Sequence, residues 1–422
     1  MGDTMERSTQ NHRPMNYDVV IVGAGPAGST AAKHLAENNI HVLLLDKYTF
    51  PRKKPCGGGL PIRAVEKFPY LKDAGVIESY SYGGYGHYSL LEYVAKVEKN
   101  EPILAMIQRE KFDHTLVQLA MESGAQFLEG KTVVDVTISK DHAAVVLDDG
   151  TVFKAKIIIG ADGVYSTVAQ KTGLCPGQRP ISLCIFQEYQ LPVRVLDEYF
   201  TQKRMVHIFL RFEEIIGYGW VFPKNSSVNI GIDEVRIDAL QPGKKKNLKE
   251  LYKEYFLLLK EKNIIPADLE MGKVQGAALP LFPLKKTYAD RVLLCGDAAG
   301  FINPLTGEGL YYAMASGAIA AEVVLQALSS HDTSGQFLSR YQSRCNADFG
   351  DDFKMFVHVN NRWGKYVKKL FPIVVSDKLL SEMILDIGIG RIRIKEYRWK
   401  VFRRFLFVLV TYPFRRRMKE NR

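Results

Sequence analysis

Short apolar runs alternate with small-residue stretches at the start of the chain. Residues 17–22 form one such run and residues 41–45 form the next, with an alanine-rich stretch between them. Each run has the length and apolar content of a buried strand, and the stretch between them favours a helix. Similar runs recur at residues 156–160 and 291–295. Strands that alternate with helices in this way predict an α/β domain with a largely parallel sheet.

The middle of the chain has the pattern of a second sheet. Residues 183–190, 205–212 and 227–233 read as strands, and neighbouring strands of this kind predict antiparallel pairing. Residues 250–262 place apolar side chains at helical spacing, so we expect an amphipathic helix that packs on this sheet. Such a sheet is a usual place for a long apolar pocket.

Aromatic residues alternate along one further strand of this region, residues 217–224. Every second residue of an extended strand shares a face, so Tyr218, Trp220 and Phe222 are predicted to form one continuous aromatic wall. The wall either lines a pocket for a long apolar ligand or forms the core face of the sheet, where aromatic strand residues ordinarily lie.

A glycine-rich turn joins the first strand to its helix. Gly23 permits the tight turn, Gly25 lets a pyrophosphate approach the backbone, and Gly28 allows close packing of the helix. Asp46, at the end of the second strand, is placed to bind a ribose hydroxyl. Strand, glycines, helix, second strand and acid therefore predict a dinucleotide-binding unit, without choosing between FAD and NAD(P).

Two later strands run into turns that pair glycine with an acid. Asp162 and Gly163 follow one strand, and Gly296 and Asp297 follow the other. An acid at the carboxyl end of a parallel strand can accept hydrogen bonds from a polyol. A helix N-terminus just behind the second turn favours negative charge nearby.

These three motifs, in this order, resemble the FAD-dependent oxidoreductases of the aromatic hydroxylase type. The resemblance implies that the first turn binds the ADP half of FAD and that Asp297 holds the ribityl chain. The loop from Pro304 to Gly309 would then pass close to the isoalloxazine ring. Arg109 begins a stretch similar to that family's RxxFDxxL segment and would lie against the phosphates or the adenine side. Alternatively, Arg109 starts a helix and pairs with Asp113.

Two further stretches resemble the geranylgeranyl reductase family, and the resemblance covers roughly residues 16–345. They are Pro-Cys-Gly-Gly-Gly at residues 55–59, after a basic segment, and Tyr-Gly-Trp-Val-Phe-Pro-Lys at residues 218–224. The implied function is an FAD-dependent reductase that saturates carbon-carbon double bonds of geranylgeranyl chains, with a membrane glycerophospholipid as the expected substrate. The cofactor-binding residues implied by the motifs are Gly23, Gly25, Ala27, Gly28, Asp46, Lys47, Cys56, Gly57, Gly58, Arg109, Asp162, Gly163, Gly296, Asp297, Pro304, Gly307 and Gly309.

The implied chemistry needs a hydride for one alkene carbon and a proton for the other. Cys56 is the first candidate for the acid, and Tyr218 is the second. The thiol of Cys56 could instead contact the reacting carbon, or be a buried, unreactive cysteine. Tyr218, Trp220 and Phe222 would bind the chain and stabilise developing positive charge.

Several other functions fit the same motifs. A flavin monooxygenase or halogenase would consume oxygen, and a quinone-prenyl or chlorophyll-prenyl reductase would act on a different carrier. A membrane-bound electron carrier would reduce a partner instead of a prenyl chain. The electron donor is left open among NADPH, ferredoxin and another carrier. We expect no metal site, because the histidines and five cysteines are scattered, and we expect the cysteines to be free thiols of a reducing compartment.

The positive charge of the chain is concentrated at its C-terminus. The net charge is +11, and residues 387–422 hold 12 Lys and Arg against 2 acidic residues. The body is therefore nearly neutral, which argues against a nucleic-acid partner. Residues 399–417 place a short apolar run between basic residues; the run is too short to cross a bilayer of about 30 Å. This segment is either interfacial or a helix that docks on the body.

We therefore expect a cytoplasmic protein, peripheral on the inner face of the cell membrane, because the polar N-terminus also lacks the pattern of a signal peptide. The expected architecture is a Rossmann-like FAD-binding domain interleaved with an antiparallel substrate domain and followed by a helical region with a basic tail. The predicted boundaries are 1–15 for a flexible extension, 16–60, 101–175 and 285–335 for the FAD-binding domain, 61–100 and 176–284 for the substrate domain, and 336–422 for the C-terminal region.

Overall fold

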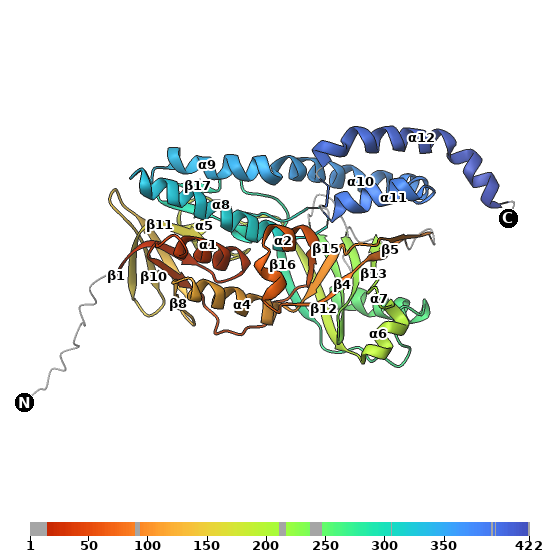
Figure 1. Cartoon of the computed structure of the whole chain (residues 1–422), viewed down its shortest axis with the longest axis horizontal. Helices are drawn as coiled ribbons and strands as arrows, with labels where there is room; N and C mark the ends of the chain where they lie inside the picture. The colour runs from red at the N-terminus through yellow and green to blue at the C-terminus, as the bar shows by residue number, and fades with distance from the viewer. Residues whose placement is uncertain are drawn as a thin grey trace, which may run out of the picture.

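The computed structural model describes residues 15–88, 93–210, 217–236, 247–304, 306–389, 391–392 and 394–420. Two β-rich bodies lie side by side along its long axis, and C-terminal helices extend across both of them (Figure 1). The predicted N-terminal extension lies outside the described residues apart from Met15, which begins the first strand. The α/β class predicted from the apolar runs is confirmed.

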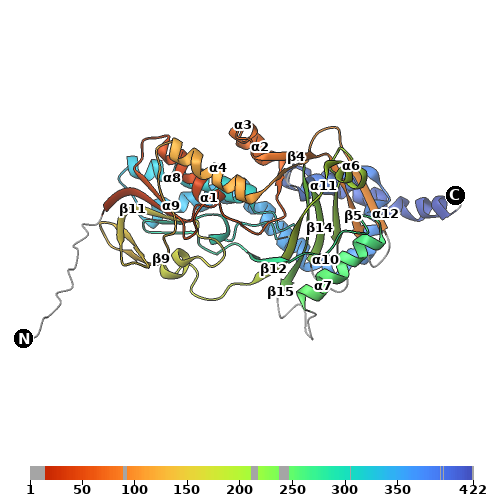
Figure 2. The same cartoon turned by 90° about the horizontal axis from the view of Figure 1, so that it is seen from below.

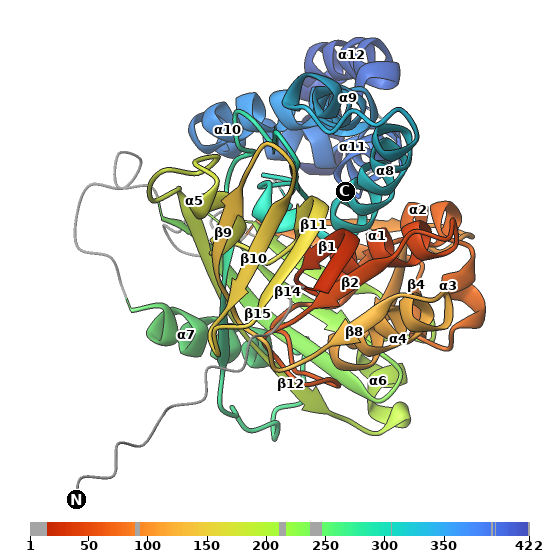
Figure 3. The same cartoon turned by 90° about the vertical axis from the view of Figure 1, so that its left-hand side faces the viewer.

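The first body is built around a mainly parallel sheet. Its strands are β1 (Met15–Val22), β2 (Val42–Leu45), β8 (Gln126–Leu128), β9 (Val133–Ile138), β10 (Ala143–Leu147), β11 (Val152–Gly160), β17 (Tyr288–Ala289) and β18 (Val292–Leu294). Strands β18, β11, β1, β2 and β8 run parallel in this order, with antiparallel β17 at one edge and β10 and β9 added beside β11 (Figure 3). All four residues of β2 are buried, because a parallel sheet is covered on both faces.

Helices pack on this sheet and on one another. They are α1 (Pro26–Ala36), α4 (Arg109–Glu122), α5 (Thr167–Lys171), α8 (Leu310–Ser329) and α9 (Gly335–Cys345). Helix α8 is long and apolar enough to span a membrane by length and composition, but 72% of its apolar window is buried inside the protein. It packs against α1 and α9 (Figure 2), so its apolar surface is explained by the core of this body.

The second body is a twisted sheet of seven strands. They are β5 (Gly83–Tyr88), β6 (Tyr93–Glu98), β12 (Ile181–Gln190), β13 (Val206–Leu210), β14 (Gly217–Pro223), β15 (Ser227–Arg236) and β16 (Gln275–Pro280). Their order is β16-β12-β15-β14-β13-β5-β6, and their pairing is antiparallel except between β13 and β5, which run parallel. The difference from the predicted antiparallel sheet arises because β5 enters from an earlier part of the chain.

One face of this sheet is covered by α6 (Val193–Phe200) and α7 (Leu248–Glu261). The predicted amphipathic helix at residues 250–262 corresponds to α7, which buries Tyr252, Phe256 and Leu259 against Ile230 and Ile232 of β15. Because strand side chains alternate between faces, the neighbouring residues of β15 point to the opposite side of the sheet. That side faces the first body.

Short elements connect the two bodies. They are the three-stranded sheet of β3 (Gly59–Pro61), β7 (Leu104–Ile107) and β4 (Ile77–Ser81), with helices α2 (Ile62–Lys67) and α3 (Tyr70–Asp73). The 3-10 turn η3 (Gly296–Ala298) lies within the first body, between β18 and α8. Strand β3 begins at Gly59, the last of the three glycines that follow Cys56, so the segment after Cys56 is part of this connection.

The C-terminal region is helical, as predicted. It contains a short π-helix, η4 (Asn346–Gly350), followed by α10 (Asp351–Val375), α11 (Lys378–Gly388) and α12 (Ile394–Glu420). Helix α12 packs on α10 and α11 through Val408, which contacts Ile373, Val374 and Leu380. An ion pair between Arg404 and Asp377, with Nη2 to Oδ2 at 2.7 Å, adds to this contact.

The contact between α1 and α8 gives a test of the fold. A Cβ at Gly317 of α8 would lie 2.2 Å from the carbonyl oxygen of Ala27 in α1, so Gly317→Ala requires backbone displacement. We expect it to lower the free energy of unfolding by about 1–3 kcal/mol in urea denaturation. Gly388→Ala is the control, because a Cβ at that helical position has no atom within 4 Å. Equal stability of the two variants would contradict this packing.

Candidate active site

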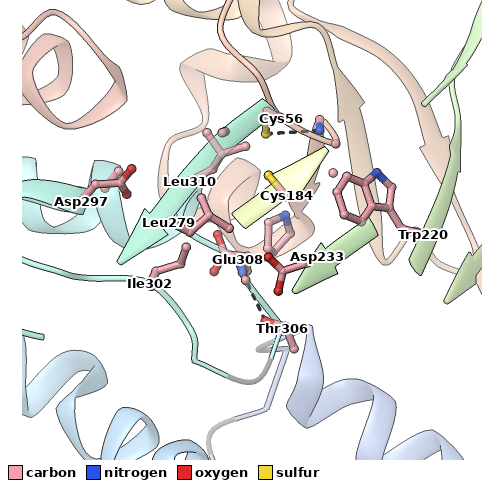
Figure 4. A pocket seen from close by; sticks show the side chains of 18 of the residues that line it. Cys56, Cys184, Trp220, Asp233, Leu279, Asp297, Ile302, Thr306, Glu308 and Leu310 are labelled. Carbon is pink, nitrogen blue, oxygen red and sulfur yellow. Dashed lines mark hydrogen bonds between the residues drawn. The ribbon is translucent and has the colours of Figure 1, made fainter. Parts of the chain in front are cut away.

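A cavity of about 1250 Å³ lies between the two bodies. It runs from the glycine turn after β1, past the segment around Cys56 and the inner face of the second sheet, to α11 and α12. Figure 4 shows side chains from several distant parts of the chain that point into it. Of the residues predicted to bind a cofactor or substrate, only Gly28 and Pro304 do not border this cavity.

The glycine turn is shaped by close contacts that exclude side chains. Gly23 has a φ of +104°, and a Cβ there would lie 2.3 Å from the carbonyl oxygen of Ala161. A Cβ at Gly28 would lie 1.9 Å from the carbonyl oxygen of Gly23. Gly25 is different, because its nearest neighbour would be Arg52 at 3.8 Å. Gly23 and Gly28 therefore hold the turn, and Gly25 leaves space on the cavity side, as a bound pyrophosphate requires.

Asp46 is held at the end of β2 by two backbone groups. Ala24 N–H donates to Oδ2 at 2.8 Å, and Tyr48 N–H donates to Oδ1 at 2.9 Å. The carboxylate thus stabilises the glycine turn, and Asp46 and Lys47 both border the cavity.

Asp162 has mainly a structural role. The Ser166 hydroxyl donates to Oδ1 at 2.5 Å and Val168 N–H donates to Oδ2 at 3.1 Å, so the carboxyl organises the start of α5. Burial raises the pKa of Asp162, and these hydrogen bonds oppose that effect. The neighbouring Gly163, with a φ of +83°, borders the cavity and turns the chain away from it.

Asp297 presents its carboxylate to the cavity (Figure 4). Its side chain accepts no hydrogen bond from the residues that the structure describes, whereas its backbone carbonyl accepts one from Arg179 at 2.6 Å. Arg179 also donates to the carbonyl of Val164, so it ties the two glycine-acid turns together. Sequence reasoning missed Arg179, because no local pattern marks a residue that joins two distant turns.

Basic side chains gather near the glycine turn. Asp113 is fully buried and pairs with both Arg109, with Nε to Oδ1 at 2.7 Å, and Arg52, with Nη2 to Oδ2 at 3.2 Å. Arg109 starts α4 and pairs with Asp113, as the helix-start interpretation predicts, and it also borders the cavity, as a role beside the cofactor requires. Burial acts to lower the pKa of Arg109, but the neighbouring Asp113 carboxylate outweighs this effect, so the pKa of Arg109 is raised. Burial lowers the pKa of nearby Lys54.

These contacts leave two of the three guanidinium nitrogens of Arg52 without a hydrogen-bond partner in the part of the chain that the structure describes. Its Nε and Nη1 are buried without a hydrogen-bond partner in the described chain, and it lies above Gly25. Unpaired buried guanidinium nitrogens are costly unless an anion completes them. A pyrophosphate at the glycine turn fits both the free nitrogens and the open side of Gly25. The sequence indicated only a basic segment at this position.

The segment after Cys56 lies directly on the aromatic wall. A Cβ at Gly57 would be 3.0 Å from the ring of Phe222, and a Cβ at Gly58 would be 2.2 Å from the carbonyl oxygen of Ile107. Gly58 N–H donates to Cys56 Sγ at 3.4 Å. Only residues without side chains allow this approach, which brings Cys56 and the wall to the same cavity.

Asn229 joins the wall to the Cys56 segment. Trp220 Nε1–H donates to its Oδ1 at 2.8 Å, and its Nδ2 donates to the carbonyl oxygen of Cys56 at 3.3 Å and to Glu188 at 2.7 Å. The predicted wall is present, with ring centroids 5.8 Å apart for Tyr218 and Trp220. Trp220 is also buried, so the wall is at once part of the core and part of the cavity lining.

Tyr218 connects the wall to the loop before α8. Its hydroxyl donates to the carbonyl oxygen of Thr306 at 2.5 Å, and burial raises its pKa well above its usual value. A Cβ at Gly307 would lie 2.8 Å from the same hydroxyl, so glycine is needed there. Gly309 precedes α8 and, like Gly307, borders the cavity, whereas Pro304 is buried outside it.

Two further acids of the cavity were missed by sequence reasoning. Glu308 is paired with Arg63, with Nη2 to Oε2 at 3.3 Å, and burial raises its pKa. Asp233 lies on β15 opposite Tyr218, and Figure 4 labels it among the side chains of the cavity. The alternation of Asn229, Gly231 and Asp233 along that strand was the available signal, since these residues share the face of the wall.

The remaining expectations concern metals and thiols. No group of three or more His, Cys, Asp or Glu side chains within the described ranges is arranged to hold a metal ion. All five cysteines are free. His207, predicted to be structural, lies on the far face of the sheet, with Nδ1 at 3.0 Å from Nε2 of His87.

Comparisons with known proteins show the family to which the chain belongs. Residues 16–349 match the FAD binding domain family model. The digeranylgeranylglycerophospholipid reductase 1 of Methanopyrus kandleri is 33% identical over 89% of this chain and 98% of its own. The digeranylgeranylglycerophospholipid reductase of Methanocaldococcus jannaschii is 32% identical over 78% of this chain and 82% of its own.

A solved structure shares the fold over nearly the whole length. A geranylgeranyl bacteriochlorophyll reductase-like protein from Thermoplasma acidophilum superposes with a TM-score of 0.77 at 22% identity, over 92% of this chain and 99% of its own. The expectation of FAD is confirmed by the family match over most of the chain. The chain is an FAD-dependent reductase, and it belongs to the geranylgeranyl reductase family.

Proposed function

We propose that this protein saturates carbon-carbon double bonds in geranylgeranyl chains of a membrane glycerophospholipid. The observation that carries the proposal is the continuous cavity that joins the FAD-binding turns to the aromatic wall and to α12. Two relatives are named for reduction of such a lipid, which supports the same substrate class. A long apolar chain suits a cavity whose inner half is lined largely by apolar side chains.

The residues around the glycine turn fit FAD. Gly25 and Arg52 would receive the pyrophosphate, Asp46 the adenosine ribose, and Asp297 the ribityl hydroxyls. When bound and reduced, FAD supplies the hydride of the reaction. The chain's part is to hold the alkene in position, exclude water and provide the proton.

The aromatic wall would hold the prenyl chain. Isolated alkenes are poor hydride acceptors. The site must therefore stabilise the positive charge that develops on one alkene carbon as the other carbon takes the proton, because the charged carbon then accepts the hydride. The faces of Tyr218, Trp220 and Phe222 suit such charge. Asn229 fixes the Trp220 ring, and the Cys56 segment rests on it, so Cys56 can contact the reacting carbons.

Helix α12 supports a membrane location. Its exposed apolar side chains include Trp399, which is 64% exposed, and Val410, which is 71% exposed, whereas Val408 is fully buried. One face of the helix therefore docks on the body, as one sequence interpretation predicts, and its other apolar side chains are exposed, as the interfacial interpretation requires. Phe402 and Phe405 of the same helix border the cavity. We infer that α12 lies on the cytoplasmic membrane surface and admits the lipid chain.

The basic side chains of α12 favour an anionic surface. Arg398, Lys400 and Arg403 are exposed beside the apolar residues. The side chains of Arg415, Arg416 and Arg417 lie outside the described residues. Cations around exposed rings are typical of an interfacial helix.

A prenyl-pigment or prenyl-quinone substrate is the second candidate. It is favoured by the shared fold of the Thermoplasma protein, which is described as geranylgeranyl bacteriochlorophyll reductase-like. Competition between a geranylgeranyl phospholipid and a geranylgeranyl pigment under limiting reductant would separate the two. A monooxygenase, a halogenase or an electron carrier would be revealed by oxygen consumption, or by reduction of an acceptor with no saturation of any prenyl chain.

Asp297 tests the cofactor site. Asp297→Ala removes a carboxylate that faces the cavity and would accept ribityl hydroxyls, so FAD should bind about 10- to 100-fold more weakly. Asp268→Ala changes an exposed acid outside the cavity and should bind FAD as the wild type does. Fluorescence titration of the apoprotein with FAD measures both. Unchanged affinity in folded Asp297→Ala would remove this role.

Cys56 tests the catalytic segment. Cys56→Ala should retain FAD and be reduced by dithionite at the normal rate, yet saturate a geranylgeranyl lipid about 100-fold more slowly, because a group at the developing charge is lost. Cys175→Ala is the control, since that half-buried thiol lies outside the cavity. Mass spectrometry without oxygen counts two hydrogen atoms per reduced double bond. Wild-type rates in Cys56→Ala would show that the thiol has only a packing role.

The membrane contact is tested on α12. Trp399→Ser and Val410→Ser should each weaken binding to anionic phospholipid vesicles by about tenfold or more, because each removes a side chain that would enter the interface. Leu257→Ser removes an equally exposed apolar side chain from α7 and should not change binding. Added salt should weaken binding of all variants. If Leu257→Ser weakens binding as much as the α12 variants do, the contact is not specific to α12.

A further inference from the structure

A polar row crosses the inner face of the second sheet. Asp233 of β15 pairs directly with Cys184 of β12 on one side and with Tyr218 of β14 on the other. Side chains directly opposite each other in neighbouring strands share a face. All three therefore border the cavity, and Figure 4 shows Asp233 below Cys184 and beside Glu308.

The surroundings of Asp233 disfavour its ionised form. Its side chain is buried, with only 5% of the residue exposed, beside a cluster that includes Phe186, Trp220 and Leu279. The groups that act most on it are the Ser182 hydroxyl and the Glu234 carboxylate, and neither is a cation. Burial raises the pKa of Asp233 to about 7. A carboxyl in such a place takes up a proton because no cation compensates its charge.

Ser182 gives independent evidence for that proton. Its hydroxyl oxygen lies 2.6 Å from Asp233 Oδ1 and 2.9 Å from the carbonyl oxygen of Glu234. A serine hydroxyl has one hydrogen and can donate to only one of these two acceptors. If it donates to the Glu234 carbonyl, Asp233 must donate to it, and this arrangement satisfies both contacts. A neutral Asp233 therefore accounts for the geometry.

The acids expected from the sequence are less suited to deliver a proton. The hydroxyl hydrogen of Tyr218 is already donated to the carbonyl oxygen of Thr306. Cys56 Sγ accepts from Gly58 N–H and interacts with Arg109, so it faces hydrogen-bond donors. Contact with the reacting carbon, the second role expected for Cys56, agrees better with these neighbours.

We propose that Asp233 is the proton donor of the saturation reaction. The inference rests on the proposed function. The O–H bond of the carboxylic acid breaks as the π electrons of the alkene take its proton, and the other alkene carbon receives the hydride. Asp233 is left as a carboxylate, which regains a proton from water after the product chain moves away. Each double bond thus gains one hydride and one proton.

The proposal defines a pH dependence. Asp233 must be protonated to act, so saturation should slow as pH rises through about 7. Once Asp233 is ionised, the Ser182 hydroxyl turns to donate to its carboxylate and thereby lowers the pKa of Asp233, so Ser182→Ala should move this decline to higher pH. The other titratable groups that face Asp233 are Cys184 on β12 and Tyr218 on β14, with Cys56 and Glu308 across the cavity. Glu234, the next residue on its own strand, lies on the opposite face and raises the pKa of Asp233 through its charge.

Asp233→Asn is the decisive variant, because an amide has the shape of the acid but has no acidic proton. In FAD-loaded protein it should bind FAD and be reduced by dithionite as the wild type is. Saturation of a geranylgeranyl phospholipid should fall by about 10²- to 10⁴-fold, the usual effect of losing a positioned acid. Asp268→Asn makes the same change at an exposed acid outside the cavity and should retain the wild-type rate.

A second readout does not depend on turnover. Infrared difference spectra of FAD-loaded wild type, recorded about one pH unit below and above 7, should show a protonated carboxyl band at the lower pH. The band should be missing in Asp233→Asn. If Asp233→Asn does not fold, Ser182→Ala replaces it in the test. Its carboxyl band and its saturation rate should both change at a higher pH than those of the wild type.

The outcomes separate this role from the proposed function. Saturation by Asp233→Asn at the wild-type rate, or a carboxyl band that the substitution leaves in place, would overturn the role of Asp233 alone. An unchanged pH profile in Ser182→Ala would also overturn it. Failure of the wild type to saturate any prenyl lipid would overturn the proposed function, and the proton donor with it.

Discussion

The cavity depends on one close contact, in which the three glycines after Cys56, residues 57–59, pack directly on the aromatic wall. A Cβ at Gly57 would lie 3.0 Å from the Phe222 ring, and a Cβ at Gly58 would lie 2.2 Å from the carbonyl oxygen of Ile107, so neither position has room for a side chain. Asn229 then bonds both the Trp220 ring and the carbonyl of Cys56. This contact holds the second sheet against the nucleotide-binding body, so the cavity walls come from both and neither body forms the site alone.

Charge divides the cavity into two chemical regions. Arg52, Arg109 and Lys54 lie at the end with the glycine turn, where a phosphate group would give the unpaired nitrogens of Arg52 a partner. Toward α11 and α12 the lining is apolar. This division of charge suits a dinucleotide at one end and the proposed hydrocarbon chain at the other, because burying either one at the wrong end would desolvate charge without a partner. Asp233 lies near their meeting point, where a neutral acid is tolerated.

Several sequence alternatives turned out not to exclude each other. Arg109 is both the start of a helix, paired with Asp113, and a residue of the cavity. Trp220 is both core and lining. Helix α12 both docks through Val408 and exposes other apolar side chains. A side chain or helix has more than one surface, and a one-dimensional pattern does not say which surface meets which neighbour.

The sequence by itself determined the features that depend on local spacing. These are the parallel strands, the glycine turn with Asp46, the glycine-acid turns and the alternating aromatic wall, because each follows from backbone geometry over a few residues. Only the tertiary structure decided which residues meet across the cavity. Arg179 joins two turns, Glu308 pairs with Arg63, and Asp233 becomes a buried acid. Their roles come from long-range contact and loss of water, and these exist only after the two sheets close on each other.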